Sequence, residues 1–206
     1  VIETEINSVT DNPVISRDGR RFLHGGNFHG DYVAVAVDHV KIAMTKLALL
    51  TERRINFFLN RNANGGIFPP FLNLATPGLT MGLQGLQFVA TSTAAHCQSL
   101  SFPHSLHSIS TNGDNQDIVS MGADAALIAQ KVLENCYTVL AIECVTIAQA
   151  YDSLPEAARR KASRATRDLV TSTRRRLKTI REDRPLAQEL ATLSDALRYE
   201  KDFLGY

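Results

Sequence analysis

The chain has little cysteine: three residues among 206, at positions 97, 136 and 144. So small a number at irregular spacing excludes a disulfide framework and a zinc site. Cys136 and Cys144 lie on one predicted helix, about 12 Å apart along its axis, so they cannot form a disulfide with each other. We therefore expect Cys97, Cys136 and Cys144 to be small, buried apolar side chains.

The chain also lacks a large excess of charge of one sign, because it contains 22 Lys and Arg and 21 Asp and Glu. This balance excludes a protein that binds nucleic acid through bulk positive charge. The charge is uneven, since residues 1–150 carry 9 Lys and Arg against 12 Asp and Glu, whereas residues 151–206 carry 13 against 9. Aromatic residues are not interleaved with the basic ones of the second segment. We interpret it as a solvated helical surface and expect no nucleic-acid partner.

No signal peptide and no uninterrupted apolar stretch of membrane length is visible in the sequence. We therefore expect a cytoplasmic protein without a membrane partner. The chain begins at Val1, without an initiator methionine and already within a helical pattern. We interpret it as a fragment of a longer protein.

Common catalytic motifs are missing as well. His104 and His107 lie in a predicted loop with no acidic or cysteine partner at ligand spacing, so we expect no metal site. Gly25-Gly26 is not followed by a lysine, which argues against a phosphate-binding loop. No serine nucleophile elbow, no zinc-binding helix motif and no internal repeat of 20–50 residues occurs.

Long helical patterns dominate what is present. Apolar side chains recur every three or four residues in five segments. The predicted helices span 31–60, 79–100, 116–150, 154–178 and 185–199. Small residues in the second helix permit close approach of its neighbours, which is typical of the centre of a bundle. We therefore predict an all-α bundle of long helices, with active-site loops in a segment at 1–150 and a charged C-terminal helical segment at 151–206.

One stretch, Ser108–Cys144, combines a polar turn with a long helical pattern. Asp114 is a good N-cap, and Asp117 three residues later makes a pair with it that resembles a capping box. Asn115 and Gln116 would then fall in the first helical turn, where unpaired backbone N–H groups suit an anion or a small polar ligand. The alternative is a structural helix start whose amides only face water.

Two irregular segments near the N-terminus hold further candidates. Pro13 disfavours helix at Asn12, which leaves the Asn12 side chain free to point away from the backbone. Residues 14–23 have the pattern of a short hairpin. Three glycines in the run 25–30 indicate an unusual backbone that carries Phe28, whose ring is either a core plug or a ligand contact.

Four motifs in the chain stand in a characteristic order. They are NSVTDNP at 7–13, GGNFHG at 25–30, PPFL at 69–72 and DNQDIVSMG at 114–122. Together they resemble the aromatic amino acid lyases, the family of histidine, phenylalanine and tyrosine ammonia-lyases and related aminomutases. The run REDRPL at 181–186 is similar to the C-terminal end of that family, so the resemblance covers nearly the whole chain. It implies a helical bundle of the ammonia-lyase/fumarase-like type, here as a C-terminal fragment.

The resemblance also implies a chemistry. An electrophilic 4-methylidene-imidazol-5-one (MIO), formed from an internal Ala-Ser-Gly, accepts the α-amino group of the substrate. A tyrosine base removes a β-proton, and ammonia leaves to give an arylacrylate. This sequence contains no Ala-Ser-Gly, and none of its five tyrosines lies in a segment that resembles the loop of the base. We therefore expect the prosthetic group in a missing N-terminal part, and we expect the fragment alone to be inactive.

Five residues acquire roles from this resemblance. Asn12 matches an asparagine that faces the prosthetic group and the substrate carboxylate, and Phe28 matches the aromatic residue beside the electrophile. Asn115 and Gln116 match a pair near the substrate amino group, and Asn112 matches a position near the ring end. The family further implies an aromatic amino acid substrate and a homotetramer.

Gln116 indicates which substrate to expect. Histidine ammonia-lyases resemble the pattern Asn-Gln-Glu-Asp here, with a carboxylate at the position of Gln116. A neutral amide resembles the phenylalanine and tyrosine branch, and the run 111–122 is most similar to tyrosine ammonia-lyases. We therefore predict that L-tyrosine or L-phenylalanine loses ammonia to give p-coumarate or cinnamate. The alternatives are a histidine ammonia-lyase, a tyrosine or phenylalanine aminomutase, and a structural bundle subunit without activity.

Overall fold

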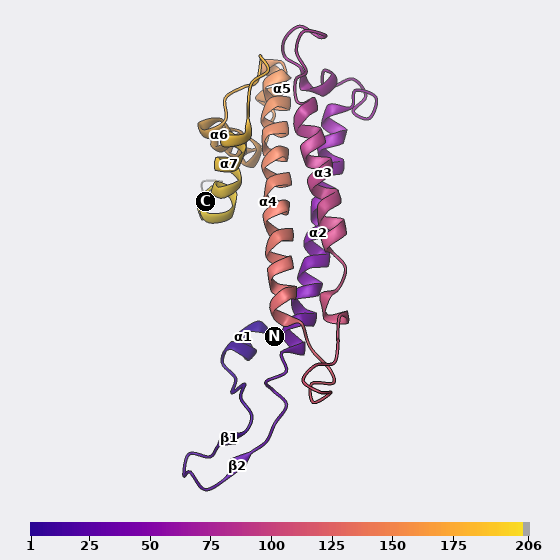
Figure 1. Ribbon diagram of the computed structural model, residues 1–206. Coiled ribbons are helices and arrows are strands. Elements are labelled where there is room, and N and C mark those ends of the chain that lie inside the picture. Colours follow the sequence, from indigo (N-terminus) through magenta and orange to yellow (C-terminus); the bar gives the residue numbers. More distant parts are fainter. Residues whose placement is uncertain (204–206) are drawn as a thin grey trace. The chain divides into compact units, whose positions relative to one another are not determined.

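The computed structural model describes residues 1–203 (Figure 1). Its contacts divide the chain into two compact units. Unit 1 contains Val1–Met44 and Ser99–Leu133, and unit 2 contains Thr45–Gln98 and Glu134–Tyr206. All three boundaries between the units fall inside long helices. The contacts therefore do not divide at residue 150, where the sequence suggested a boundary.

Helices account for most of the structure, and one small hairpin is present. The elements are α1 (Ile2–Ile6), β1 (Val14–Ile15), β2 (Phe22–Leu23), α2 (Asp31–Leu59), η1 (Pro70–Leu72), α3 (Gln84–Leu100), η2 (His104–Leu106), α4 (Gly122–Ser153), α5 (Glu156–Arg159), α6 (Arg164–Arg176) and α7 (Ala187–Tyr199). The predicted all-α class with three long helices is confirmed. The predicted hairpin is also confirmed, because β1 and β2 pair antiparallel with Val14 opposite Leu23.

Two of the long helices begin later than predicted. α3 begins at Gln84 and not at residue 79, because the chain still turns at Gly78 and Gly82, where φ is +87° and +60°. The N–H of Leu83 donates to the carbonyl of Phe71 at 2.9 Å, so it takes no part in a helix. α4 begins at Gly122 and not at residue 116, for a reason that lies in the candidate site.

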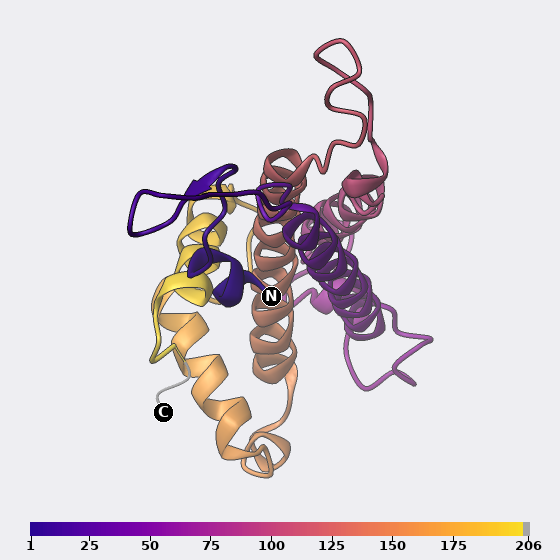
Figure 2. The same ribbon diagram turned by 90° about the horizontal axis from the view of Figure 1, so that it is seen from below.

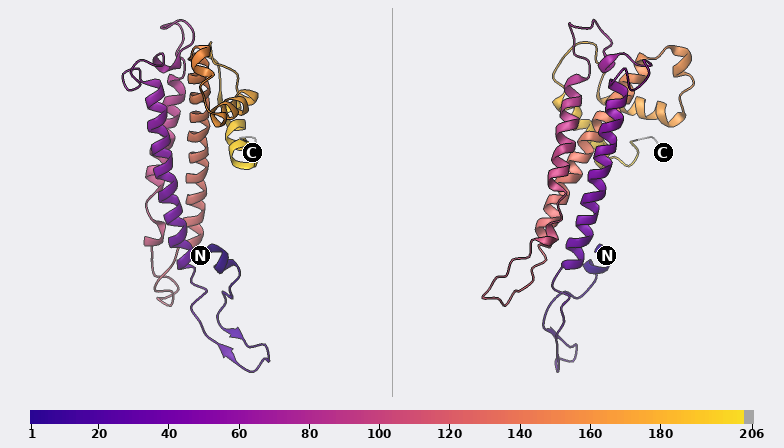
Figure 3. Two further views of the ribbon diagram at one scale, coloured as in Figure 1. Left: turned by 180° about the vertical axis from the view of Figure 1, so that it is seen from behind. Right: turned by 90° about the vertical axis from the view of Figure 1, so that its right-hand side faces the viewer.

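The main apolar core lies in unit 2. Within this unit, the parts of α2, α3 and α4 that belong to it run side by side, and α6 and α7 lie against α4 (Figures 2 and 3). Ile142 and Val145 of α4 share one cluster of buried side chains with Leu177 and Leu193. The segment after residue 150 thus completes the core of unit 2, which explains why it does not separate as a unit of its own.

By length and composition alone α4 could cross a membrane, although charged residues such as Glu134 and Glu143 interrupt its apolar run. Its second half nevertheless has the character of a core helix, because nine of the ten residues from 141 to 150 are buried. The buried polar ones have partners inside unit 2. Arg54 donates to Glu143 at 2.8 Å, and Gln149 donates to the carbonyl of Ile180 at 2.6 Å.

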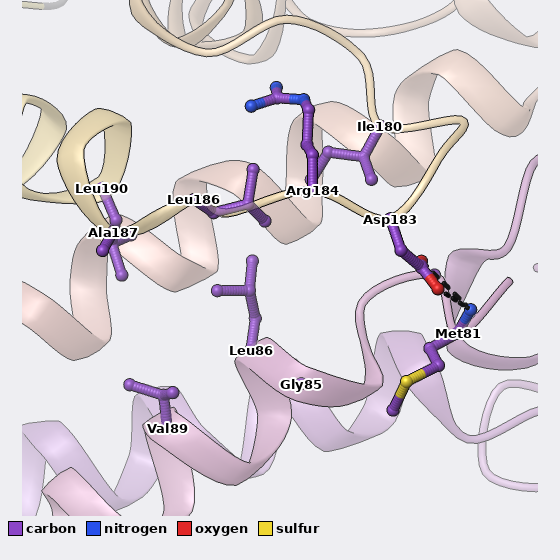
Figure 4. A pocket seen from close by; sticks show the side chains of 11 residues that line it. Met81, Gly85, Leu86, Val89, Ile180, Asp183, Arg184, Leu186, Ala187 and Leu190 are labelled. Carbon is purple, nitrogen blue, oxygen red and sulfur yellow. Dashed lines mark hydrogen bonds between the residues drawn. The ribbon is translucent and has the colours of Figure 1, made fainter.

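Unit 2 also contains a mostly apolar cavity of about 380 Å³ (Figure 4). Leu86 and Val89 of α3 line one side, and Leu186 lies opposite them. The carboxylate of Asp183 accepts the N–H of Met81 at 3.0 and 3.1 Å, which holds the loop before α7 against the segment that leads into α3. Asp183 belongs to the run 181–186 singled out in the sequence, and its contacts in this structure are those of a packing residue.

Two neighbouring glycines allow a test of this packing. A Cβ at Gly82 would lie 2.7 Å from the carbonyl oxygen of Phe71, and the φ of +60° is itself unfavourable for alanine. We expect Gly82→Ala to lower the free energy of unfolding by roughly 2–3 kcal/mol. Gly85, which lies in α3 with nothing within 4 Å of an added Cβ, is the matched control. Gly85→Ala should stabilise by up to about 1 kcal/mol. Urea unfolding of the two variants measures both effects, and equal midpoints would contradict the strain at Gly82.

Candidate functional site

The three candidate amides Asn112, Asn115 and Gln116 lie on one turn of unit 1. The backbone N–H groups of Thr111 and Gln116 each donate to the other residue's carbonyl, at 3.1 and 3.2 Å. These two hydrogen bonds close the loop formed by residues 111–116, which we call the amide turn. The chain reverses within it at Asn112 and Gly113, where φ is +54° and +60°.

The predicted helix start at Asp114 is wrong. Asp114 has a φ of +67°, whereas an N-cap residue has an extended backbone, and its carboxylate accepts the hydroxyl of Ser110 at 2.6 Å. The carboxylate of Asp117 accepts the N–H of the next residue, Ile118, at 2.9 Å. α4 begins only at Gly122, so Asn115 and Gln116 are not at a helix N-terminus. The dipeptide Asn112-Gly113, which favours tight turns, is the sequence signal that indicated this outcome.

The amide turn presents three amide side chains to solvent, beside the carboxylate of Asp114. Asn112, Asn115 and Gln116 are all exposed. Within residues 1–203 their side-chain amides have no hydrogen-bond partner, so each can both donate to and accept from a ligand. In place of the expected helix N–H groups, the turn thus offers exposed side-chain amides.

Asn12 holds the glycine-rich loop. Its side-chain oxygen accepts the N–H of Gly25 at 2.9 Å, and the side chain of Asn27 donates to the carbonyl of Val9 at 3.0 Å. These two bonds join the chain before the hairpin to the chain after it. The expectation of a free Asn12 side chain is therefore half right: its oxygen is engaged, while no atom of the described residues accepts a hydrogen bond from its NH₂ group.

Phe28 lies on the glycine-rich loop with half of its surface exposed. Of the two alternatives for this ring, the core plug does not fit this chain, because the ring is not enclosed by the described residues. An exposed aromatic ring remains compatible with a ligand contact.

The glycine-rich loop and the segment that follows the amide turn are in contact inside unit 1. A ring nitrogen of His29 lies 3.0 Å from the carbonyl oxygen of Ile118. A Cβ added at Gly30 would lie 3.5 Å from the hydroxyl of Ser120, so these two backbones approach closely. Beyond these contacts the hairpin and the amide turn extend in different directions (Figure 3). The structure thus links the glycine-rich loop to the segment that follows the amide turn through His29 and Gly30.

A buried ion pair at the start of α2 was not predicted from the sequence. The ammonium group of Lys41 lies 2.8 Å from the carboxylate of Asp38, and the side chains are 0% and 3% exposed. Burial opposes ionisation of Asp38, but hydrogen bonds from Lys41 and from the backbone of Ser105 and His104 outweigh it and lower the pKa of Asp38 to about 2. A lysine and an aspartate three residues apart occur on many exposed helices, so only the structure shows that this pair is buried.

The three cysteines are buried, as predicted. Burial raises the pKa of the Cys97 thiol, and it raises the pKa of Cys136 to about 11 and that of Cys144 to about 12. Thiols with such pKa values are protonated at neutral pH and do not act as nucleophiles. Their burial and raised pKa values fit the predicted role as buried apolar side chains.

Residues 1–175 match the family model described as aromatic amino acid lyase. The tyrosine ammonia-lyase of Cupriavidus metallidurans is 39% identical over 198 residues, which cover 96% of this chain and 36% of the relative. The MIO-dependent tyrosine 2,3-aminomutase of Streptomyces globisporus is 41% identical over 202 residues, covering 95% and 35%. The histidine ammonia-lyase of Bacillus subtilis is 37% identical over 201 residues, covering 97% and 38%. The chain thus spans little more than a third of the length of these curated relatives.

Solved structures give the same picture of similarity. The crystal structure of the tyrosine aminomutase from Streptomyces globisporus superposes with a TM-score of 0.90 at 39% identity, over 98% of this chain and 38% of that one. The histidine ammonia-lyase from Trypanosoma cruzi superposes with a TM-score of 0.86 at 30% identity, over 98% and 41%. Lyases and aminomutases are therefore matched comparably well.

Proposed function

The chain belongs to the aromatic amino acid lyase family, and on this premise we propose that it is the C-terminal part of a cytoplasmic ammonia-lyase that acts on L-tyrosine or L-phenylalanine. The observation that carries the proposal is Gln116 of the amide turn, an exposed neutral amide with no carboxylate at its position. A neutral amide there suits an aromatic ring without a positive charge better than an imidazolium, which a carboxylate would pair with.

The residues present fit a place beside the MIO group, which another segment must supply because this chain has no Ala-Ser-Gly. The unpartnered NH₂ group of Asn12 can donate to the group or to the substrate carboxylate, and the exposed ring of Phe28 can cover its apolar face. When present, the group supplies an electrophile for the substrate's α-amino group. We call the assembly of that segment with residues 1–206 the complete enzyme.

Each candidate residue then has a proposed task. Asn12 binds the substrate carboxylate, and Phe28 excludes water from the reacting carbon. Asn115 and Gln116 orient the substrate near its amino group, and Asn112 lies toward the ring end. These are positioning tasks, in which uncharged hydrogen bonds fix one pose of the substrate so that a base can reach its β-proton.

We also propose that the complete enzyme is a homotetramer. Large apolar side chains are exposed along the long helices: Val40, Leu50, Phe57, Phe88 and Leu127. Exposed apolar side chains of this number on helices mark surfaces that another chain covers.

Incubation of the complete enzyme with L-tyrosine, L-phenylalanine and L-histidine tests the proposal. We expect the absorbance of p-coumarate or cinnamate to grow, urocanate to form much more slowly, and residues 1–206 alone to be inactive. Accumulation of a β-amino acid in place of arylacrylate would establish the aminomutase instead. Absence of product from all three substrates would favour a structural subunit.

A further inference from the structure

The buried pair Asp38–Lys41 holds a segment that the proposed function uses. The Lys41 ammonium group donates to the carbonyl of Phe102 at 2.6 Å, and the Asp38 carboxylate accepts the N–H of Ser105 at 2.9 Å. Both partners belong to residues 102–105, which lie shortly before the amide turn. We call 102–108 the outgoing stem of the turn and 117–121 its return stem.

The two stems are held to each other and to other segments of unit 1 by hydrogen bonds. The hydroxyl of Ser108 on the outgoing stem accepts the N–H of Val119 on the return stem at 2.8 Å. The return stem is further held by the contact of His29 with the carbonyl of Ile118. The outgoing stem is held to α2 through Phe102 and Ser105. The position of the amide turn in unit 1 therefore depends on a short series of polar contacts, of which the buried pair is the least exposed.

Stability is a poor explanation for this pair. Removing both charges from water costs free energy that their attraction does little more than offset, and apolar replacements of similar volume often fold as well. The pair instead fixes the position of the backbone that it contacts, because a buried ammonium and a buried carboxylate each require hydrogen-bond partners at defined places. Those partners are the backbone groups of residues 102–105.

We propose that Asp38 and Lys41 are positioning residues, which fix the outgoing stem so that Asn115 and Gln116 meet the substrate in one orientation. The proposal rests on the proposed function for its substrate, but its structural part concerns this chain alone. Neither side chain needs to touch the substrate. Loss of the contacts that Asp38 and Lys41 make should leave the fold in place but allow the amide turn to shift.

The double variant Asp38→Leu/Lys41→Met tests the proposal in the complete enzyme. It removes the charges without leaving one of them unpaired, so it avoids the misfolding that Lys41→Met alone could cause. We expect its thermal midpoint to stay near that of the wild type, its hydrogen exchange to rise across residues 101–121, and kcat/KM for the aromatic substrate to fall roughly 10- to 100-fold. Single Asp38→Asn keeps an acceptor for Ser105 but leaves the buried Lys41 ammonium without its carboxylate, so its thermal midpoint should fall below that of the double variant.

Glu143→Gln is the matched control, because it weakens the ion pair with Arg54 in unit 2. It should lower the thermal midpoint while leaving exchange across 101–121 and kcat/KM as in the wild type. Wild-type exchange across 101–121 in the double variant, or faster exchange with unchanged kcat/KM, would overturn the positioning role. A wild-type enzyme that converts no aromatic amino acid would overturn the proposed function instead, and the exchange measurement would still decide whether the pair holds the stem.

Discussion

Replacing Gln116 by glutamate is expected to lower kcat/KM of the complete enzyme for L-tyrosine or L-phenylalanine roughly 10- to 1000-fold, or about 1.4–4 kcal/mol of transition-state stabilisation. The two side chains have the same size, and the backbone of Gln116 is already fixed by its two hydrogen bonds to Thr111. The turn should therefore persist, and the change is one of charge. A carboxylate in a site that the substrate closes loses part of its hydration, and an uncharged ring offers it no charged partner in return.

The charge already present on the turn strengthens this expectation. The carboxylates of Asp114 and Asp117 flank Gln116, so a third one would add repulsion among like charges. L-histidine, whose imidazolium can pair with the new carboxylate, should lose less or nothing. Gln188→Glu makes the same chemical change at an exposed position of α7 and should leave kcat/KM unchanged. Equal kinetics of the wild type and Gln116→Glu on L-tyrosine would show that this amide does not face the substrate.

Asn115→Ala belongs to the same experiment. It removes a donor and an acceptor without offering a replacement, so we expect a loss with every substrate and a larger one than for Gln116→Glu. The side chain of Asn115 has no partner among the described residues, so its removal should not affect folding. A loss of thermal stability in this variant would contradict that description of the turn.

The long helices could be predicted because their apolar residues repeat along the chain. α2 begins at Asp31 and ends at Leu59 as expected, since a regular pattern over so many residues outweighs local exceptions. The start of α4 could not be placed in this way. Asp114 is a suitable N-cap in isolation, but the adjacent Asn112-Gly113 favours a left-handed turn, and the hydrogen bonds with Thr111 decide between the two conformations.

In the candidate site, the residues could be predicted from the sequence, but the contacts that hold their loops could not. The resemblance in sequence pointed to Asn12, Phe28 and Gln116, and the structure shows all three exposed in unit 1. The contacts that hold their loops join residues far apart in the chain, such as Lys41 with Phe102 and His29 with Ile118. No spacing rule relates such pairs, because they depend on which segments the fold brings together.

Gln149 is the clearest example of a residue whose long-range contacts could not be predicted from the sequence. It is fully buried in the second half of α4, and nothing in the sequence distinguishes it from the exposed glutamines. Its NH₂ group donates to the carbonyl of Ile180 at 2.6 Å and lies 3.4 Å from that of Leu72. Its oxygen accepts the N–H of Ile180 and the guanidinium of Arg174, both at 3.2 Å. One side chain thus joins α4 to the end of η1, to α6 and to the loop before α7.

Gln149→Ala should therefore destabilise the protein by roughly 3–5 kcal/mol, because it leaves a cavity and several buried polar groups without partners. In a domain of this size the thermal midpoint falls by about 2–4 °C for each kcal/mol. Gln87→Ala is the matched control: Gln87 is only partly buried and donates a single side-chain hydrogen bond, to Asn56 at 3.1 Å, so about 1 kcal/mol is expected. Thermal unfolding of the two variants beside the wild type provides the comparison. Similar midpoints for both would mean that the polar contacts of Gln149 contribute no more than a surface hydrogen bond, and that the loops of unit 2 are held by apolar packing alone.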